Sequence, residues 1–171
     1  MKFSKIIVCA SLLVSSLFAA EFVNYDKLSK NLKEEAKKSE NYASTEEMKK
    51  ALTEKDWAVV DVRTAEEWAA GFIAGTQRVG REAPEKALEG IVLDDNGKFI
   101  KDKLIVVCNT ASRASIEAEA FRKMGFTTVK IYDIHKWIDE CNPITTKYSS
   151  AVDKTGTNKK FGDYYAEYCK K

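Results

Sequence analysis

Histidine is nearly absent from this chain, and the shortage limits the nucleophilic chemistry that the protein can support. The one histidine, His135, lies within a predicted helix and outside any pattern that would pair it with a cysteine. A cysteine protease needs a histidine beside its nucleophile. The sequence therefore argues against that class of enzyme.

The chain also lacks a strong excess of charge of either sign. Its 28 basic and 26 acidic residues leave a formal net charge of +2, and no basic stripe interleaved with aromatic residues occurs. Nucleic-acid-binding domains concentrate basic charge on one surface, so we expect no nucleic acid as a partner. Internal repeats and low-complexity segments are missing too, which favours one domain with one ordinary core.

The main apolar run is too short to span a bilayer. It covers residues 6–18, follows the charged start of the chain and precedes Ala19-Ala20, which is the arrangement of a secretory signal peptide. A membrane span needs about 20 apolar residues, so a cleaved signal is favoured over the alternative of an uncleaved anchor. We expect residues 1–20 to be removed on export to a bacterial periplasm, with no stable membrane insertion afterwards.

Cysteine is scarce, and its count after signal removal is odd. Cys108, Cys141 and Cys169 remain, and an odd number in an exported protein leaves one thiol unpaired. The position of Cys108 after a buried strand nominates it as the free thiol, and Cys141 and Cys169 would then form a disulfide that pins the C-terminal tail. The alternative is that Cys141 resolves an oxidised Cys108, because sequence does not give their separation.

Strands and helices alternate along the middle of the chain. Two capping boxes, Ser44 with Glu47 and Thr64 with Glu67, predict helices over 45–54 and 65–71. The apolar patterns predict further helices over 82–89, 113–124 and 134–140, and strands over 57–62, 75–79, 104–107 and 127–132. This order predicts an α/β domain with a mainly parallel sheet, whose ligand site lies beyond the carboxyl ends of the strands. Cys108 lies at such an end.

Two extensions flank the predicted domain at 44–146. The N-terminal extension, 21–43, has apolar residues at helical spacing and is expected to form a helix lying on the body. The tail, 147–171, carries aromatic residues that share one face of a predicted helix: Phe161, Tyr164, Tyr165 and Tyr168. Packing of this face against the domain is favoured over its use as a partner-binding surface.

The segment Cys108-Asn109-Thr110-Ala111-Ser112-Arg113 places a thiol between a buried strand and the start of a helix. Backbone amides at a helix N-terminus and the Arg113 guanidinium stabilise a thiolate and hold an anionic substrate. Four residues separate Cys108 from Arg113, whereas the phosphate loop of cysteine phosphatases has five. The loop is therefore too tight for a tetrahedral phosphate and suits sulfur, and a cysteine phosphatase is the alternative that would need a longer loop.

Four segments, in order, resemble a rhodanese domain over residues 44 to about 143. They are Asp61-Val62-Arg63-Thr64-Ala65-Glu66-Glu67-Trp68, Gly71-Phe72-Ile73-Ala74-Gly75-Thr76, the strand ending in Cys108, and Trp137-Ile138-Asp139-Glu140 before Asn142-Pro143. The Cys108 loop, with Gly80-Arg81 before it and Met124-Gly125-Phe126 after it, is most similar to periplasmic polysulfide-sulfur transferases of sulfur-respiring bacteria. The resemblance implies a single rhodanese-like domain with a mainly parallel central sheet flanked by helices.

The resemblance also implies a sulfurtransferase that needs no metal or other cofactor. In this family the loop cysteine takes a sulfane sulfur from thiosulfate or polysulfide, carries it as a persulfide and passes it to a thiophilic acceptor. Cys108 would be the nucleophile, and the amides of Asn109, Thr110, Ala111, Ser112 and Arg113 would stabilise the persulfide. Arginines would gather the anionic chain: Arg63, Arg81 and Arg113. The implied partners are small sulfur-containing anions, a periplasmic thiol protein or sulfur-reducing enzyme, and a second copy in a homodimer.

Several residues depart from the family pattern. Ala111 stands where the loop usually has glycine, which predicts backbone strain. Asn109 stands where a basic residue often follows the cysteine, and Phe72 replaces the usual histidine. The Asn109 departure predicts weak anion capture and low turnover. The Ala111 and Asn109 departures support the alternative of a non-catalytic sulfane-sulfur carrier or thiol-partner binding module.

The predicted arginine ligands also have simpler interpretations. Arg63 can pair with Asp61 or Glu67 to hold the end of the strand, which is an equal alternative to anion binding. Arg81 can be a solvated loop residue. Glu67 itself is explained by helix capping.

Overall fold

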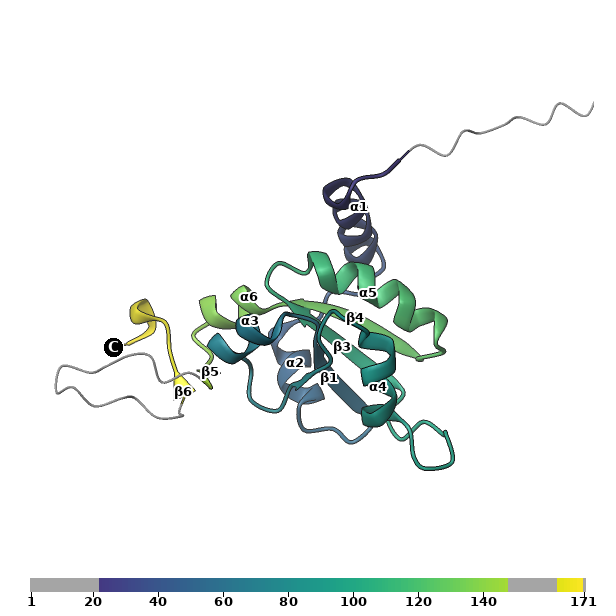
Figure 1. Ribbon diagram of the computed structural model, residues 1–171. Coiled ribbons are helices and arrows are strands. Elements are labelled where there is room, and N and C mark those ends of the chain that lie inside the picture. Colours follow the sequence, from purple (N-terminus) through teal and green to yellow (C-terminus); the bar gives the residue numbers. More distant parts are fainter. Residues whose placement is uncertain (1–21, 148–162, 171) are drawn as a thin grey trace, which may run out of the picture.

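A four-stranded parallel sheet forms the centre of the protein (Figure 1). The computed structural model describes residues 22–147 and 163–170. The strands are β1 (Trp57–Asp61), β2 (Gln77–Arg78), β3 (Lys103–Cys108) and β4 (Thr128–Asp133), in the order β2-β1-β3-β4. All three pairings are parallel, which confirms the predicted fold class.

Helices cover both faces of the sheet and create two apolar cores. Helices α4 (Pro84–Val92) and α5 (Ser112–Lys123) contribute to one core, and α2 (Thr45–Ala51) and α6 (Ile134–Asp139) contribute to the other. Side chains alternate along β3, so that Leu104, Val106 and Cys108 enter the first core while Ile105 and Val107 enter the second. The Cys108 side chain therefore points toward the layer that contains α5.

Local signals set most of the helix starts. Both predicted capping boxes are present, at Ser44 before α2 and at Thr64 before α3 (Ala65–Ala70). The predicted ends are less accurate, since α2 stops at Ala51 and α4 runs on to Val92. The strand expected over 75–79 is shorter, because only Gln77 and Arg78 pair with β1.

The N-terminal extension forms α1 (Tyr25–Lys38), which stands beside α5 in Figure 1. Ala36 of α1 is buried in the first core, whereas the start of the helix is exposed. The chain then runs along the outer edge of β4, where Tyr42 forms a parallel bridge with Ile131. The amide of Ala43 also donates to the carbonyl of Ile131, at 3.0 Å. These contacts hold α1 near the carboxyl end of the sheet.

The tail does not form the predicted helix. Strand β6 (Asp163–Tyr164) pairs antiparallel with β5 (Ile144–Thr145), and a short 3-10 turn, Glu167–Cys169, follows. The prediction is wrong because a short terminal segment takes its conformation from its partners: here strand pairing and a disulfide override the aromatic spacing. Tyr165 and Tyr168 are exposed, so the expected packing of this aromatic face is wrong for both.

Cys141 and Cys169 form a disulfide, with their Cα atoms 5.4 Å apart. This confirms the pairing favoured from the sequence. The predicted signal peptide at 1–20, Phe161 and most of the tail lie outside the described residues. Within the described ranges, no helix is both long enough and apolar enough to cross a membrane.

Candidate active site

Cys108 ends the central strand β3 and is the free cysteine of the described chain. Its side chain is 1% exposed, and its Sγ accepts a hydrogen bond from the amide of Ala114 at 3.4 Å. Ala114 is the third residue of α5, and its amide has no carbonyl partner within the helix. The thiol thus caps the N-terminus of α5, since Ala111 at the cap position has no side chain that accepts a hydrogen bond.

The amides of residues 109–113 stay the predicted donors to a persulfide. Within the described residues, the unmodified thiol accepts from the amide of Ala114, one position beyond that segment. The reason is that α5 begins at Ser112, so that its third amide, rather than its first or second, faces back toward the strand end.

Ala111 turns the chain from the loop into α5. Its backbone lies in the left-handed region, at φ 58° and ψ 2°, and its methyl group is fully buried. This confirms the predicted strain, because an L-residue other than glycine pays about 1 kcal/mol or more in that region. The turn aims the helix N-terminus at Cys108.

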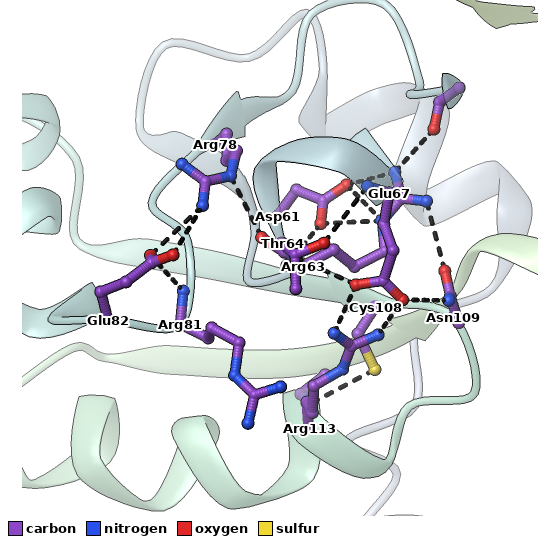
Figure 2. A network of polar contacts seen from close by, with 12 residues as sticks. Asp61, Arg63, Thr64, Glu67, Arg78, Arg81, Glu82, Cys108, Asn109 and Arg113 are labelled. Atoms are coloured by element: carbon purple, nitrogen blue, oxygen red, sulfur yellow. Dashed lines mark hydrogen bonds and ion pairs between the residues drawn. The ribbon is translucent and has the colours of Figure 1, made fainter. Parts of the chain in front are cut away.

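Glu67 of α3 holds the two ends of the loop together (Figure 2). Arg113 donates to both of its carboxylate oxygens, at 2.6 and 2.8 Å, and the Asn109 side-chain amide donates to one of them at 2.7 Å. The Arg113 guanidinium, and then the Thr64 amide, lower the pKa of Glu67 to about 2 despite its partial burial. Arg113 therefore already has a counter-ion at the site.

The sequence missed this second role of Glu67. Its capping interactions are present: it accepts from the Thr64 amide at 3.0 Å while the Thr64 hydroxyl caps the helix. Capping uses one carboxylate oxygen and leaves the other free to bind partners. The available signal was the pair of polar residues, Asn109 and Arg113, that the topology brings to the same edge of the sheet.

Arg63 is 4% exposed and fully engaged by protein groups. It donates to both carboxylate oxygens of Asp61, at 2.7 to 3.0 Å, and to the Gly71 carbonyl at 2.7 Å. A weaker bond of 3.2 Å reaches the Asn109 side-chain carbonyl. A buried charge needs such partners. These contacts favour the structural role that the sequence left open for Arg63.

Arg81 differs from the other two arginines. It is exposed, and its guanidinium has no hydrogen-bond partner among the described residues. Figure 2 shows its side chain extending toward Arg113. Burial, and then the charge of Cys108, raise the pKa of the Tyr25 phenol, while Arg113 and Arg81 act in the opposite direction. The start of α1 thus lies within electrostatic range of the thiol and of both arginines.

The loop also presents two hydroxyls. Thr110 is exposed, and its hydroxyl lies 3.3 Å from that of Ser112. Their contact with substrate stays a prediction, as does that of the Asn109 and Arg113 amides. As a whole the arrangement offers one soft nucleophile, capped onto a helix N-terminus, in a closed loop that carboxylate–guanidinium pairs hold in place.

Several solved structures are weakly similar to this chain. A polysulfide-sulfur transferase homodimer from Wolinella succinogenes is 25% identical over 67% of this chain and 87% of its own, with a TM-score of 0.47. A protein of unknown function from Rhodopseudomonas palustris, described as a possible tyrosine phosphatase, is 16% identical over 71% and 93%, with a TM-score of 0.49. A rhodanese-related protein from Thermoplasma volcanium is 21% identical over 71% and 94%, with a TM-score of 0.42. At TM-scores below 0.5 these likenesses carry no functional information.

The sequence match to a family is decisive. No curated protein matches the chain. The Rhodanese-like domain family matches residues 44–139, which is more than half of the 171 residues and includes every element from α2 to α6. The chain therefore belongs to the rhodanese-like domain family, and this membership supports a sulfurtransferase-type role.

Proposed function

We propose that the protein is a periplasmic sulfurtransferase that carries sulfane sulfur on Cys108 as a persulfide. The observation that supports this most is the position of the free thiol. It ends the central strand of a rhodanese-like domain, and its Sγ accepts a hydrogen bond from an amide at the N-terminus of α5. An amide with no helical partner stabilises negative charge on sulfur, in the thiolate and in the persulfide alike.

The transfer takes place in two displacements at sulfur. The Cys108 thiolate attacks the sulfane sulfur of thiosulfate; a new S–S bond forms, the old one breaks, and sulfite leaves with the electron pair. With polysulfide the leaving group is a shorter polysulfide. A thiophilic acceptor, either cyanide or a thiolate, then attacks the outer sulfur, and the Cys108 thiolate leaves with the electron pair of the broken bond. No net oxidation occurs at the protein.

The loop supplies fixed geometry to these steps. Glu67 holds Asn109 and Arg113, and Arg63 holds Asn109 from the other side, so that the backbone around Cys108 is set before substrate arrives. Fixed dipoles stabilise a developing charge without reorganisation, which is the main source of electrostatic catalysis. In the cell we propose a periplasmic thiol protein or a sulfur-reducing enzyme as the acceptor, and a homodimer as the assembly.

A second candidate, a sulfane-sulfur carrier without rapid turnover, is favoured by one observation. The Cys108 side chain is 1% exposed, which restricts the approach of an acceptor to the outer sulfur. A steady-state assay with thiosulfate and cyanide separates the two candidates. Repeated turnover supports the enzyme, and release of one equivalent of sulfur per chain supports the carrier.

Intact-mass spectrometry after exposure to polysulfide tests the chemistry itself. In a Cys9→Ser background the protein should gain one or more sulfur atoms that cyanide removes, and the further change Cys108→Ser should abolish this gain. Because Cys141 and Cys169 are joined in a disulfide, neither offers a free thiol to the polysulfide. Added sulfur on Cys108→Ser would contradict the assignment of the persulfide to this residue.

A further inference from the structure

Helix α1 lies outside the segment that matches the rhodanese-like family, yet it borders the active-site loop. The family match begins at residue 44, whereas α1 covers Tyr25–Lys38. Between α1 and the carboxyl end of β4 is a cavity of about 500 Å³, a size typical of small-ligand sites. Its lining includes Thr110, which lies two residues after Cys108, and Asp133, which pairs with Cys108 in the sheet register.

Positive charge dominates the lining of this cavity. Three lysines of α1 contribute to it, and they are here called the lysine row: Lys30, Lys33 and Lys37. Lys136 of α6 also lines the cavity. The spacing of three and four residues within the row places its lysines along one side of the helix, over about 10 Å. Two carboxylates, those of Glu34 and Asp133, also line the cavity, and Lys136 is paired with Glu140 at 3.9 Å, which leaves an excess of one positive charge.

The lysine row lacks the counter-ions that the loop arginines have. Within the described residues, neither Lys30 nor Lys33 forms an ion pair or a side-chain hydrogen bond, although Lys33 is half-buried. Lys37 lies 5.9 Å above the ring of Tyr42. The Asp133 carboxylate is already used, because it accepts from the His135 amide at 2.8 Å as the cap of α6. Unpaired ammonium groups around a cavity are available to an anion.

Tyr42 connects the cavity to the thiol. It lines the cavity, and burial, followed by the charges of Asp133 and Cys108, raises the pKa of its phenol. The cavity and Cys108 are therefore within electrostatic range of the same side chain. Thr110 and Asp133 place the cavity beside Cys108, in the loop and in the sheet register respectively.

We propose that the lysine row of α1 is a subsite for extended sulfur dianions, and that it selects a polysulfide chain over the shorter thiosulfate. The selectivity follows from length. A short anion at the thiol leaves most of the row unoccupied, whereas a chain with charge at both ends places its second charge among the ammonium groups. This proposal deepens the proposed function and rests on it for the identity of the ligand.

Binding without chemistry tests the subsite. The background is the full chain with Cys9→Ser and Cys108→Ser, which removes both cysteines outside the disulfide. The probes are tetrathionate, a linear sulfur dianion, and thiosulfate, both titrated by calorimetry at low ionic strength. We expect Lys30→Ala/Lys33→Ala to weaken tetrathionate binding by about tenfold, because each lost lysine–anion contact should weaken it by about threefold. Thiosulfate binding should weaken by less than about twofold.

Two matched variants control for net charge and for the side-chain type. Lys38→Ala/Lys123→Ala removes the same charge from α1 and α5 outside the cavity and should leave both affinities unchanged. Lys30→Arg/Lys33→Arg keeps the charge and should retain tetrathionate binding. Added salt should reduce the tetrathionate affinity of the parent more steeply than that of Lys30→Ala/Lys33→Ala.

Three results would overturn the subsite: no tetrathionate binding by the parent, equal losses in both double-alanine variants, or equal losses for the two probes. These results are separable from a failure of the proposed function. Lysine-dependent binding without a persulfide on wild-type Cys108 removes the function and keeps the subsite. A persulfide on Cys108 together with lysine-independent binding keeps the proposed function and removes the subsite.

Discussion

The two sides of the active-site loop carry positive charge in opposite ways. On the side of α3, Arg63 and Arg113 are paired with Asp61 and Glu67. On the side of α1, Lys30 and Lys33 have no carboxylate partner within the described part of the chain. Guanidinium groups form planar, bidentate pairs that fix geometry, whereas ammonium groups on long flexible stems respond to whatever anion arrives.

This difference assigns separate tasks to the two sides. The arginine pairs hold the loop in the shape that puts a helix N-terminus against Cys108, so they are expected to govern stability. The lysine row is expected to govern the affinity for anions and to add little to stability. Replacing residues on each side, and measuring both quantities, tests whether the tasks are separate.

The largest effect is expected from the buried pair. Arg63→Ala leaves the Asp61 carboxylate, which is fully buried, without its counter-ion, and the free energy of unfolding should fall by about 3–5 kcal/mol. Urea denaturation followed by circular dichroism measures it. Lys50→Ala, which breaks an exposed pair with Glu54, is the control and should cost less than about 1 kcal/mol. Equal costs would contradict the structural role of Arg63.

The Glu67 pair should have an intermediate effect that depends on pH. Because its pKa is about 2 in the folded protein and 4.5 in a model peptide, the pair stabilises the fold fully above pH 4.5 and is lost as the pH falls toward 2. The carboxylate is about one-third exposed, so solvent screening limits the contribution to about 1 kcal/mol.

Denaturation curves at pH 7, 4.5, 3 and 2 measure this contribution. Glu67→Gln should be less stable than the wild type at pH 7, and the difference should vanish near pH 2. Glu66→Gln, one position earlier in the first turn of α3, should follow the wild-type curve. A constant difference between Glu67→Gln and wild type across this range would show that the loss comes from packing and not from the ion pair.

The effect at the turn between the two sides is expected to depend on the side chain that replaces Ala111. Ala111→Gly relieves a left-handed alanine but removes a buried methyl group and adds chain entropy, each worth about 1 kcal/mol, so the net change in stability should stay within about 1 kcal/mol. Ala111→Val should be destabilising by more than 2 kcal/mol, roughly, because a β-branched residue does not fit that conformation or the packed space around it. Similar stabilities for the two variants would contradict the strain at this position.

The smallest effect on stability is expected from the lysine row. Lys30→Ala/Lys33→Ala removes no ion pair, so its free energy of unfolding should lie within about 0.5 kcal/mol of wild type. Thermal unfolding at low and high salt measures it. A loss as large as that of Glu67→Gln would mean that these lysines hold α1 on the body, and the division between the two sides would not stand.

The success of the sequence-based predictions also differs between the parts of the molecule. The α3 side was largely predictable, because capping boxes, the strand before Cys108 and the spacing to Arg113 are local signals. The partners of Glu67 were not, since a carboxylate that caps a helix carries no mark of a second contact 46 residues away. The tail was mispredicted for a related reason, because β5 and the Cys141–Cys169 disulfide determine its conformation.

The sequence by itself determined the alternation of strands and helices and the free thiol at a strand end, because hydrophobic period and capping act over a few residues. The strained turn at Ala111 was what the family resemblance implied. Only the tertiary structure decided which charges are neutralised around Cys108 and which stay open. Ion pairing depends on distances between separate elements. An arginine or lysine has a structural role where the fold places a carboxylate beside it, and it is available to bind an anion where the fold does not.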